Sequence, residues 1–398
     1  MPDSSLFGTS DTAWMAEKRA AAIQLLPSLS MPTEREENWR YLDLDFDPAL
    51  DAAAVKPGTG TPDPIVEGWH GTVVSIVDGF AVTEGVPTLA QLQDAEDLIK
   101  DRDLFSTAFV AYAPGSAYVG KDLIDHPVLV DIQSTGSATT FPGVHVDVPA
   151  GKDATVVVRM RSTNDEASIV IPTVAASVGD NARLTLSLIQ DWNYQTRAIG
   201  RCVIQLGRDA GLTFSEIGLG GKVGRLHLDV DFVGNGSHGK IYGAYFGEDS
   251  QTLDYRYFMN HIGTNTRADM FLKGAVADRA LSVFTGMIRI EETGQRTESF
   301  QTNRNLILSD GASAQSVPTL EILNNDVKCG HGSSIGPLDG DQRYYLMSRG
   351  LTPERADRLQ VHGFFEEVVE QIPDDHVASW ARDRINSKYI QAQEEGRV

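Results

Sequence analysis

The densest group of chemically active side chains lies at residues 325–332, which read Asn-Asp-Val-Lys-Cys-Gly-His-Gly. Residues 320–322, Leu-Glu-Ile, come just before and are typical of a strand. Side chains two residues apart in an extended chain share a face, so Cys329 and His331 should point the same way. A thiolate and an imidazole on one face form half of a site for a soft metal. The spacing therefore predicts a half-site that needs about two more ligands, from elsewhere in the chain or from a second chain.

The surroundings of Cys329 leave several uses of this thiol open. Lys328 lies beside it and could lower its pKa by Coulomb attraction, although Lys328 points to the other face. A cysteine hydrolase would need an orienting group, and Asn325 and Asp326 are too close in sequence to serve well. A buried thiol beside an ordinary histidine is the simplest alternative. The other cysteine, Cys202, lies in an apolar run and is expected in the core.

Other catalytic and nucleotide-binding motifs are missing from the sequence. The nearest match to a phosphate-binding loop, Gly221-Lys222-Val223, lacks the hydroxyl residue and the first glycine. There is no Gly-x-Ser-x-Gly elbow, no His-Glu-x-x-His and no Cys-x-x-Cys. We therefore expect that this chain binds no nucleotide, and that its other histidines are structural or lie on the surface.

Length and charge limit the class of protein. The chain has 398 residues and a net charge of −21, with 34 basic and 55 acidic side chains. Such a surface repels phosphate backbones and anionic lipid, so nucleic-acid and membrane roles are not expected. Two cysteines are too few for a disulfide framework, and no signal peptide or spanning segment is evident. These observations predict a cytoplasmic protein.

The middle of the chain alternates apolar and polar residues with a period of two, as at Leu184, Leu186 and Leu188. Turn clusters recur at a fixed interval. Their leading glycines are 28, 28, 29 and 27 residues apart, at Gly151, Gly179, Gly207, Gly236 and Gly263. This period with strands in each unit predicts a solenoid, and a parallel β-helix in particular. A sandwich with long strands is the alternative, although its turns would come every 8–12 residues or so.

Helical patterns flank this region. A first helix is expected from a cap at Ser10 or Asp11 to Leu26, followed by a short helix at 34–39. A Pro/Gly-rich linker at 47–64, a strand at 73–77 and a helix at 88–100 come next. After residue 336, helices are expected at 341–348, from a Thr352 cap with Pro353 at its first position, and from Asp374 or Asp375. The predicted domains are an N-terminal helical domain (1–100), a β-helix core (101–336) and a C-terminal helical domain (337–398). The last helices must pack on the solenoid end or on a partner.

Five segments, in the expected order, resemble the SufB/SufD family of iron–sulfur cluster assembly proteins. They are residues 37–41 (Glu-Asn-Trp-Arg-Tyr), 300–309, 318–322, 326–332 and 344–350 (Tyr-Tyr-Leu-Met-Ser-Arg-Gly). The SufB branch carries Glu-His-Glu where this chain has Cys329-Gly330-His331, and a cysteine about where Asn303 stands. The chain is therefore more similar to the SufD branch, from which Gly330 and Ser333-Ser334 depart mildly.

The resemblance implies a right-handed parallel β-helix between helical N- and C-terminal domains. It implies a non-catalytic scaffold subunit in a complex with SufB and the ATPase SufC, which docks on the C-terminal helices. His331, and less directly Cys329, would face SufB and help to hold an iron or a transient iron–sulfur cluster. The missing ligands and the missing nucleotide motif would then both come from partners.

Two other functions are left open by the sequence. Parallel β-helices also host polysaccharide lyases and hydrolases, whose acids could be Asp229, Asp231, Asp249 and Asp254. Alternating acids on strands are more often a solvated face. Alternatively, the chain could act alone as a homodimeric scaffold.

Overall fold

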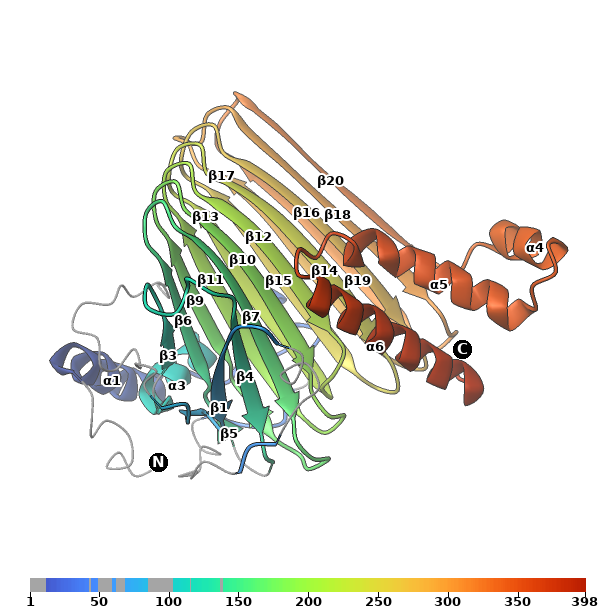
Figure 1. Ribbon diagram of the computed structural model, residues 1–398, viewed down its shortest axis with the longest axis horizontal. Helices are drawn as coiled ribbons and strands as arrows, with labels where there is room; N and C mark the ends of the chain where they lie inside the picture. The colour runs from blue at the N-terminus through green and yellow to red at the C-terminus, as the bar shows by residue number, and fades with distance from the viewer. Residues whose placement is uncertain are drawn as a thin grey trace.

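The computed structural model of the chain describes residues 12–42, 44–48, 59–61, 69–84, 103–114, 116–136 and 139–398. Its body is a stack of coils whose strands form two sheets, A and B (Figure 1). Within the described residues each sheet has ten strands, and all pairs are parallel except β1 with β2. The predicted parallel β-helix is confirmed, and the sandwich alternative is wrong.

Successive long strands alternate between the two sheets, so each coil lies on the coil before it. Sheet A consists of β1 (Thr72–Val77), β2 (Phe80–Ala81), β4 (Val128–Ser134), β7 (Asp153–Ser162), β10 (Arg183–Asp191), β12 (Gly211–Gly218), β14 (His238–Gly247), β16 (Arg267–Val276), β18 (Thr297–Ile307) and β20 (Val327–Gly336). Sheet B consists of β3 (Ser116–Val119), β5 (Thr139–Thr140), β6 (Gly143–Val148), β8 (Ile169–Val170), β9 (Thr173–Val178), β11 (Arg197–Leu206), β13 (Val223–Phe232), β15 (Thr252–His261), β17 (Leu281–Ile290) and β19 (Ser313–Ile322).

Inward-facing side chains of the two sheets fill the core. Leu184, Leu186 and Leu188 on β10 are buried, as their alternation predicted. In the parallel register Leu186 lies beside Phe214 of the next coil, which is also fully buried. Because like positions align from coil to coil, the apolar side chains form continuous columns that no single coil could shield from water. Cys202 lies in this core with no exposed surface, as expected.

One turn between the sheets repeats in six successive coils and explains the sequence period. A residue one or two positions before each of the strands β7, β10, β12, β14, β16 and β18 has a positive φ and donates its N–H to a carbonyl of the following coil, for example Asn181 to Arg208 at 2.8 Å. These residues are Gly151, Asn181, Asp209, Gly236, Asn265 and Arg296. Glycine and asparagine suit this left-handed conformation. The predicted alignment of Gly151 and Gly236 with the other leading glycines is wrong by two residues, because these two glycines hold the positive-φ position. Gly234, not Gly236, lies against Gly207, where a Cβ would be 2.0 Å from the Gly207 carbonyl carbon.

The N-terminal helices pack beside the first coils. Helix α1 (Ala13–Leu25) begins after Thr12, whose hydroxyl accepts a hydrogen bond from the Met15 N–H, so the prediction of Ser10 or Asp11 as the cap is wrong. The helix is followed by a 3-10 turn, η2 (Leu26–Ser28), and packs on α3 (Leu104–Tyr112). The helix expected at 34–39 is a single 3-10 turn, η3 (Glu37–Trp39).

The resemblance motif at 37–41 anchors this region to the outer face of sheet B. Trp39 is buried, and the Arg225 guanidinium of β13 lies over its ring at 4.0 Å. Arg225 also donates to the Asn38 carbonyl at 2.9 Å, and Arg256 of β15 donates to the Asn38 side chain at 2.6 Å. The motif therefore joins the N-terminal segment to two neighbouring coils.

The C-terminal helices are α4 (Gly340–Ser348), α5 (Pro353–Val369) and α6 (Asp375–Glu394). Thr352 and Asp374 cap α5 and α6 through their side chains, as predicted. Helices α5 and α6 lie along the outer face of sheet A (Figure 1). The expectation that they cover the solenoid end is therefore wrong, and docking of a partner on them stays a prediction.

Two predicted segments fall outside the described residues: the helix at 88–100 and most of the linker at 47–64. The strand predicted at 73–77 is confirmed as β1. The division into three domains stays a prediction. Among the described helices, none is both long enough and apolar enough to cross a membrane.

Candidate functional site

The C-terminal end of the solenoid is open. In the described part of the chain, β20 is the last strand of sheet A and pairs only with β18, while β19 is the last strand of sheet B and pairs only with β17. Both strands therefore present an unpaired backbone edge, and the inward face of the last coil has no coil above it. Unpaired edges of this kind are templates for pairing with another chain.

Register places the predicted half-site on this uncovered inward face. Cys329 pairs with Ser299 of β18, and His331 pairs with Gln301. Ser299 and Gln301 are buried and point into the core, so Cys329 and His331 point to the same side one coil further out. The prediction that the two side chains share a face is confirmed. Cys329 is half-buried against the core, whereas His331 is exposed.

The electrostatics of the thiol differ from the prediction. Lys328 points outward and pairs with Glu298 at 2.8 Å. Burial raises the pKa of the Cys329 thiol, so the expected lowering by Lys328 is wrong. In this chain alone the sulfur is therefore a protonated, weakly reactive thiol near neutral pH.

The rim of the last coil exposes apolar side chains that a folded domain ordinarily covers. The inward-facing Ile322 of β19 is 40% exposed and Ile335 of β20 is 45% exposed, while Leu323, which follows Ile322, is 53% exposed. Exposed apolar groups gathered along unpaired strands are typical of a protein–protein interface. The site is thus an incomplete coil whose two potential ligands lie among groups that need a partner.

The donor set on this chain fits iron chemically but does not complete a site. Among the described residues no group of three or more His, Cys, Asp or Glu side chains is arranged to hold a metal ion. Thiolate and imidazole are ligands that iron and iron–sulfur clusters accept. Cys202 cannot supply a third ligand because it is fully buried on β11, where burial raises its pKa well above the usual value.

Comparison with known proteins identifies the family. A family model described as "SUF system FeS cluster assembly, SufBD core domain" matches residues 131–364, from within β4 to within α5. An iron–sulfur cluster assembly SufBD family protein of Mycobacterium leprae is 31% identical over 361 residues, which cover 87% of each chain. The chain belongs to the SufB/SufD family. It is a protein of the SUF system of iron–sulfur cluster assembly.

Relatives named SufD agree with the SufD-like motifs of the sequence. The iron–sulfur cluster assembly protein SufD of Escherichia coli is 24% identical over 386 residues, covering 92% of this chain and 91% of that protein. SufD of Bacillus subtilis is 28% identical over 261 residues, covering 64% of this chain and 60% of that protein. The family match includes β18 and β20, so the open coil belongs to the shared core of this SUF protein.

The acids of the alternative, lyase-like function do not form a catalytic pair in this SUF-family fold. Asp229 pairs with Arg201 at 3.1 Å; burial opposes its charge, but His227 and Arg201 outweigh burial and lower its pKa. Asp254 forms a buried ion pair with Arg225. Asp231 accepts a hydrogen bond from Asn260 at 2.8 Å. Each of these carboxylates is thus engaged in holding neighbouring strands together.

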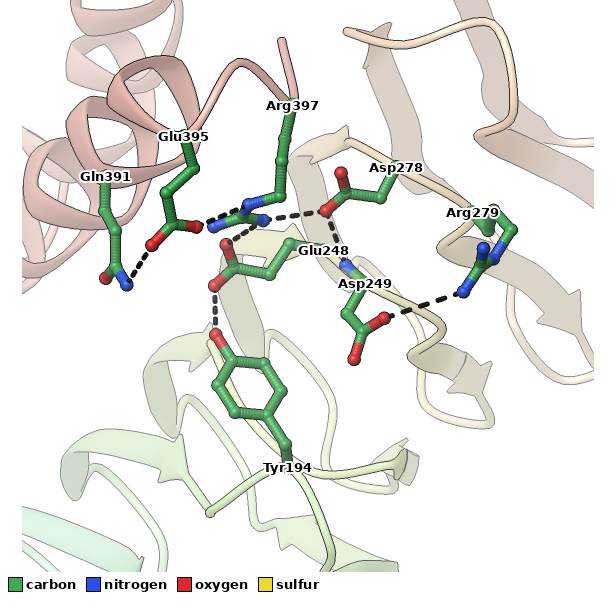
Figure 2. Close-up of a pocket in the computed structure, with 8 residues that line it drawn as sticks. All are labelled: Tyr194, Glu248, Asp249, Asp278, Arg279, Gln391, Glu395 and Arg397. Carbon is green, nitrogen blue, oxygen red and sulfur yellow. Dashed lines mark hydrogen bonds and ion pairs between the residues drawn. The ribbon is translucent and has the colours of Figure 1, made fainter.

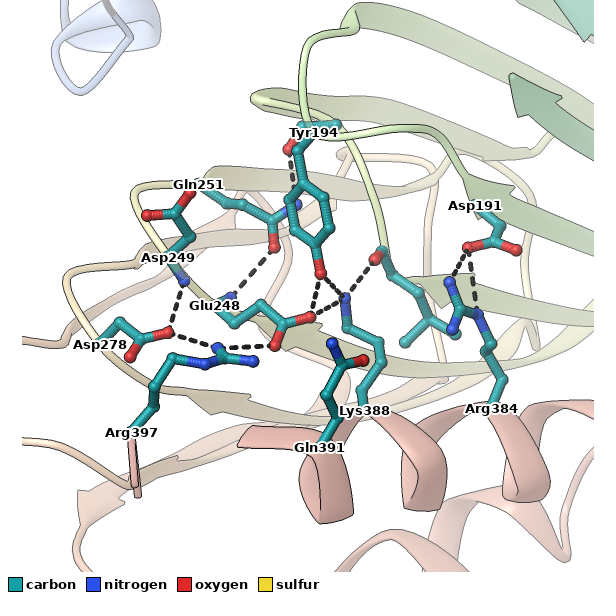
Figure 3. A network of polar contacts seen from close by, with 12 residues as sticks. Asp191, Tyr194, Glu248, Asp249, Gln251, Asp278, Arg384, Lys388, Gln391 and Arg397 are labelled. Carbon is teal, nitrogen blue, oxygen red and sulfur yellow. Dashed lines mark hydrogen bonds and ion pairs between the residues drawn. The ribbon is translucent and has the colours of Figure 1, made fainter. Parts of the chain in front are cut away.

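A buried ion-pair network that the sequence did not reveal fixes α6 to the solenoid. Lys388 of α6 is 3% exposed and pairs with Glu248 at 2.5 Å, while its ammonium also donates to the Leu219 carbonyl at 3.0 Å (Figure 3). Arg397 joins Glu248 at 2.9 Å to Asp278 at 2.7 Å. Burial alone would raise the pKa of Glu248, but Lys388 outweighs this and lowers it. We call Lys388, Glu248, Arg397 and Asp278 the α6 clamp.

A cavity of about 470 Å³ lies beside the α6 clamp, between the end of α6 and the turns of the solenoid (Figure 2). Its acidic side chains already have partners: Asp278 and Glu395 pair with Arg397, and Asp249 pairs with Arg279. Four carboxylates and two guanidinium groups line the cavity, and each carboxylate contacts a basic side chain.

Proposed function

We propose that this chain is a non-catalytic scaffold subunit of a SUF assembly complex with SufB and the ATPase SufC, in the cytoplasm. The observation that carries the proposal is the open last coil, which presents Cys329 and His331 on a face that no described strand of this chain covers. SufB would continue the stack and supply the missing ligands. The iron–sulfur cluster is cargo that forms transiently at this interface.

The chemistry of the half-site supports a shared site. Two donors on one strand leave about two coordination positions to be filled by the partner. Covering the last coil would also remove water from around the ligands, which strengthens every charged interaction there. His331 would be the firmer ligand because its side chain is exposed, whereas Cys329 must first lose a proton that burial helps it to keep.

SufC would dock on α4 and the start of α5. No side chain of α4 is buried, and Tyr344 and Tyr345 are 75% and 56% exposed. Helix α4 stands away from the sheets (Figure 1) and is held to α5 by Arg343 and Asp357 at 2.8 Å. Exposed aromatic groups on a projecting helix are typical anchors of an interface. Without SufB, the open coil could pair with a second copy, which the mass of the isolated chain in solution would reveal.

The experiment that tests the site is cluster assembly by a His331→Ala variant in the reconstituted complex. Removing the imidazole should leave the fold and the complex intact. It should reduce the rate of cluster assembly by about tenfold or more, since a ligand is lost. His238→Ala removes another exposed histidine, at the start of β14 and three coils away, and serves as the matched control. Normal assembly by the His331→Ala complex would remove His331 from the site.

The two docking surfaces are separable by mutation. Replacing Tyr344 and Tyr345 together by Ala should abolish co-purification of SufC while SufB remains bound, since the open coil is untouched. Loss of SufB rather than SufC from this double variant would contradict the assignment of the two surfaces.

A further inference from the structure

Gln301 occupies the layer of the core directly beneath His331. It lies on β18, points inward and is 2% exposed. His331 is its register partner in the last coil, and Met270 is its partner in the coil below. Gln301 is therefore the last buried polar side chain of its column before the open end.

The Gln301 side chain crosses the core from sheet A to sheet B. Its amide nitrogen donates to the carbonyl of Gly286 on β17 at 3.4 Å. A Cβ on Gly286 would lie 2.4 Å from the Gln301 Oε1 atom and 2.7 Å from the Phe284 ring, distances that real Cβ atoms do not reach. A glycine at 286 is therefore needed for Gln301 to lie flat under the last coil.

The Gln301 carbonyl oxygen has no hydrogen-bond partner among the described residues, although it is buried. A buried acceptor without a donor is costly and calls for an explanation. Met270 below has no N–H in its side chain, and Pro318, which pairs with Gly286 in the last coil, has no backbone N–H. Of the two register partners of Gln301, His331 is the one whose side chain carries an N–H.

The neighbouring position shows the contrast. Ser299 lies beneath Cys329 in the same register, and its hydroxyl already bonds to the buried ring of His261 at 3.0 Å. The polar group under the thiol is thus engaged within the core, whereas the polar group under the imidazole is not.

We propose that Gln301 is a positioning residue for His331. Its Oε1 accepts a hydrogen bond from one ring N–H of His331 when that ring turns inward, which fixes the tautomer and leaves the other ring nitrogen free to bind iron. Hydrogen bonding of a ligand histidine to a carbonyl oxygen orients the ring in this way. The proposal rests on the proposed role of His331 and adds the group that presents it.

The test is the ring nitrogen spectrum of His331 in the full-length chain labelled with ¹⁵N-histidine, at about pH 8, where an ordinary imidazole is neutral. A His331→Ala sample identifies the signals. The wild-type chain should show one predominant tautomer. Gln301→Met, which keeps the shape and removes the acceptor, should lose this bias, whereas Gln301→Glu, which keeps an acceptor oxygen, should retain it. Gln190→Met alters a buried glutamine at the same kind of position on β10 and should leave the His331 signals unchanged.

Equal tautomer ratios in the wild type and Gln301→Met would overturn the proposal. Should Gln301→Met fail to fold, Gln301→Glu decides: a wild-type tautomer supports the proposal, and loss of it overturns the proposal. The spectrum of the free chain does not depend on cluster assembly, so normal assembly by His331→Ala would defeat the proposed function while leaving this hydrogen bond standing.

Discussion

The outer face of sheet A and the open end of the solenoid are built in opposite ways. Under α5 and α6 the strands are covered by apolar side chains such as Phe365, which is 2% exposed, and are joined to α6 by the α6 clamp. At the last coil, residues of the same kind, such as Ile322 and Ile335, are 40% and 45% exposed. One surface is covered within the chain, and the other is exposed and is where we propose that a partner binds.

The helix-covered face of sheet A makes the body rigid, whereas the open end of the solenoid is available for recognition. A solenoid is stiff because each coil packs on the next, and the α6 clamp adds the helices to that rigid body. Motion imposed on α5 and α6 by a docked ATPase would therefore be carried to the coils beneath them. The last coil has no such covering, so it is the natural place for a second chain to join and to respond.

The largest effect is expected from breaking the α6 clamp. Lys388→Met should lower the free energy of unfolding by about 3–5 kcal/mol, because the buried charge of Glu248 would lose its ammonium partner and keep only the Arg397 ion pair and the Tyr194 hydrogen bond among the described residues. Urea unfolding measures the loss, and hydrogen exchange should show it first in α6. Arg382→Met, which removes the half-exposed pair with Glu366, should cost less than about 1 kcal/mol. Similar costs for the two variants would mean that the clamp does not fix α6.

A smaller effect compares one apolar column at two depths. Ile290 is fully buried, and Ile322 is its register partner one coil further out, at the open end. Ile290→Ala should cost about 2–4 kcal/mol of stability, whereas Ile322→Ala should cost under about 1.5 kcal/mol in the isolated chain. Thermal or urea unfolding distinguishes them. Equal losses would show that the last coil is already covered in the free chain.

A more gradual effect concerns the pH dependence of the closed core. Glu216 of β12 is buried, accepts a hydrogen bond from Gln190 at 2.5 Å, and burial raises its pKa to about 8. The folded chain then holds a proton that the unfolded chain releases above its ordinary pKa of about 4.3. Stability from this group is complete below that value and is lost as pH rises through about 8, at up to about 1.4 kcal/mol per pH unit.

Glu216→Gln removes this titration and supplies the control. Between pH 6 and pH 8 or so, urea unfolding of the wild type should weaken faster than that of the variant. Parallel curves for the two proteins over that range would show that Glu216 does not carry the proton.

Local patterns were sufficient to predict the coils and the shared face of Cys329 and His331. The period of two shows which side chains of a strand point inward. The repeated turn before the sheet-A strands needs residues that tolerate a positive φ, such as Asn181 and Asn265. Such signals are contained in neighbouring residues. The exact turn register was missed, because Gly234 and Gly236 fill two different positions of one turn.

Features that depend on distant contacts could not be predicted. Apolar spacing shows that α5 and α6 bury a face, but it does not say that this face meets sheet A. Lys388 is ordinary in sequence and becomes buried only because Glu248, 140 positions earlier, lies opposite it. The role of Gln301 depends on Gly286 across the core and on being one coil from the end.

The most direct test of the open coil is alkylation of Cys329 with a maleimide in the free chain and in the complex with SufB. Cys202 has no exposed surface and should stay unlabelled in both, which makes it an internal control for folding. Binding of SufB should slow alkylation of Cys329 by roughly tenfold or more, because the last coil becomes covered. An unchanged rate in a complex whose assembly is verified would place the partner elsewhere and contradict a shared site at β20.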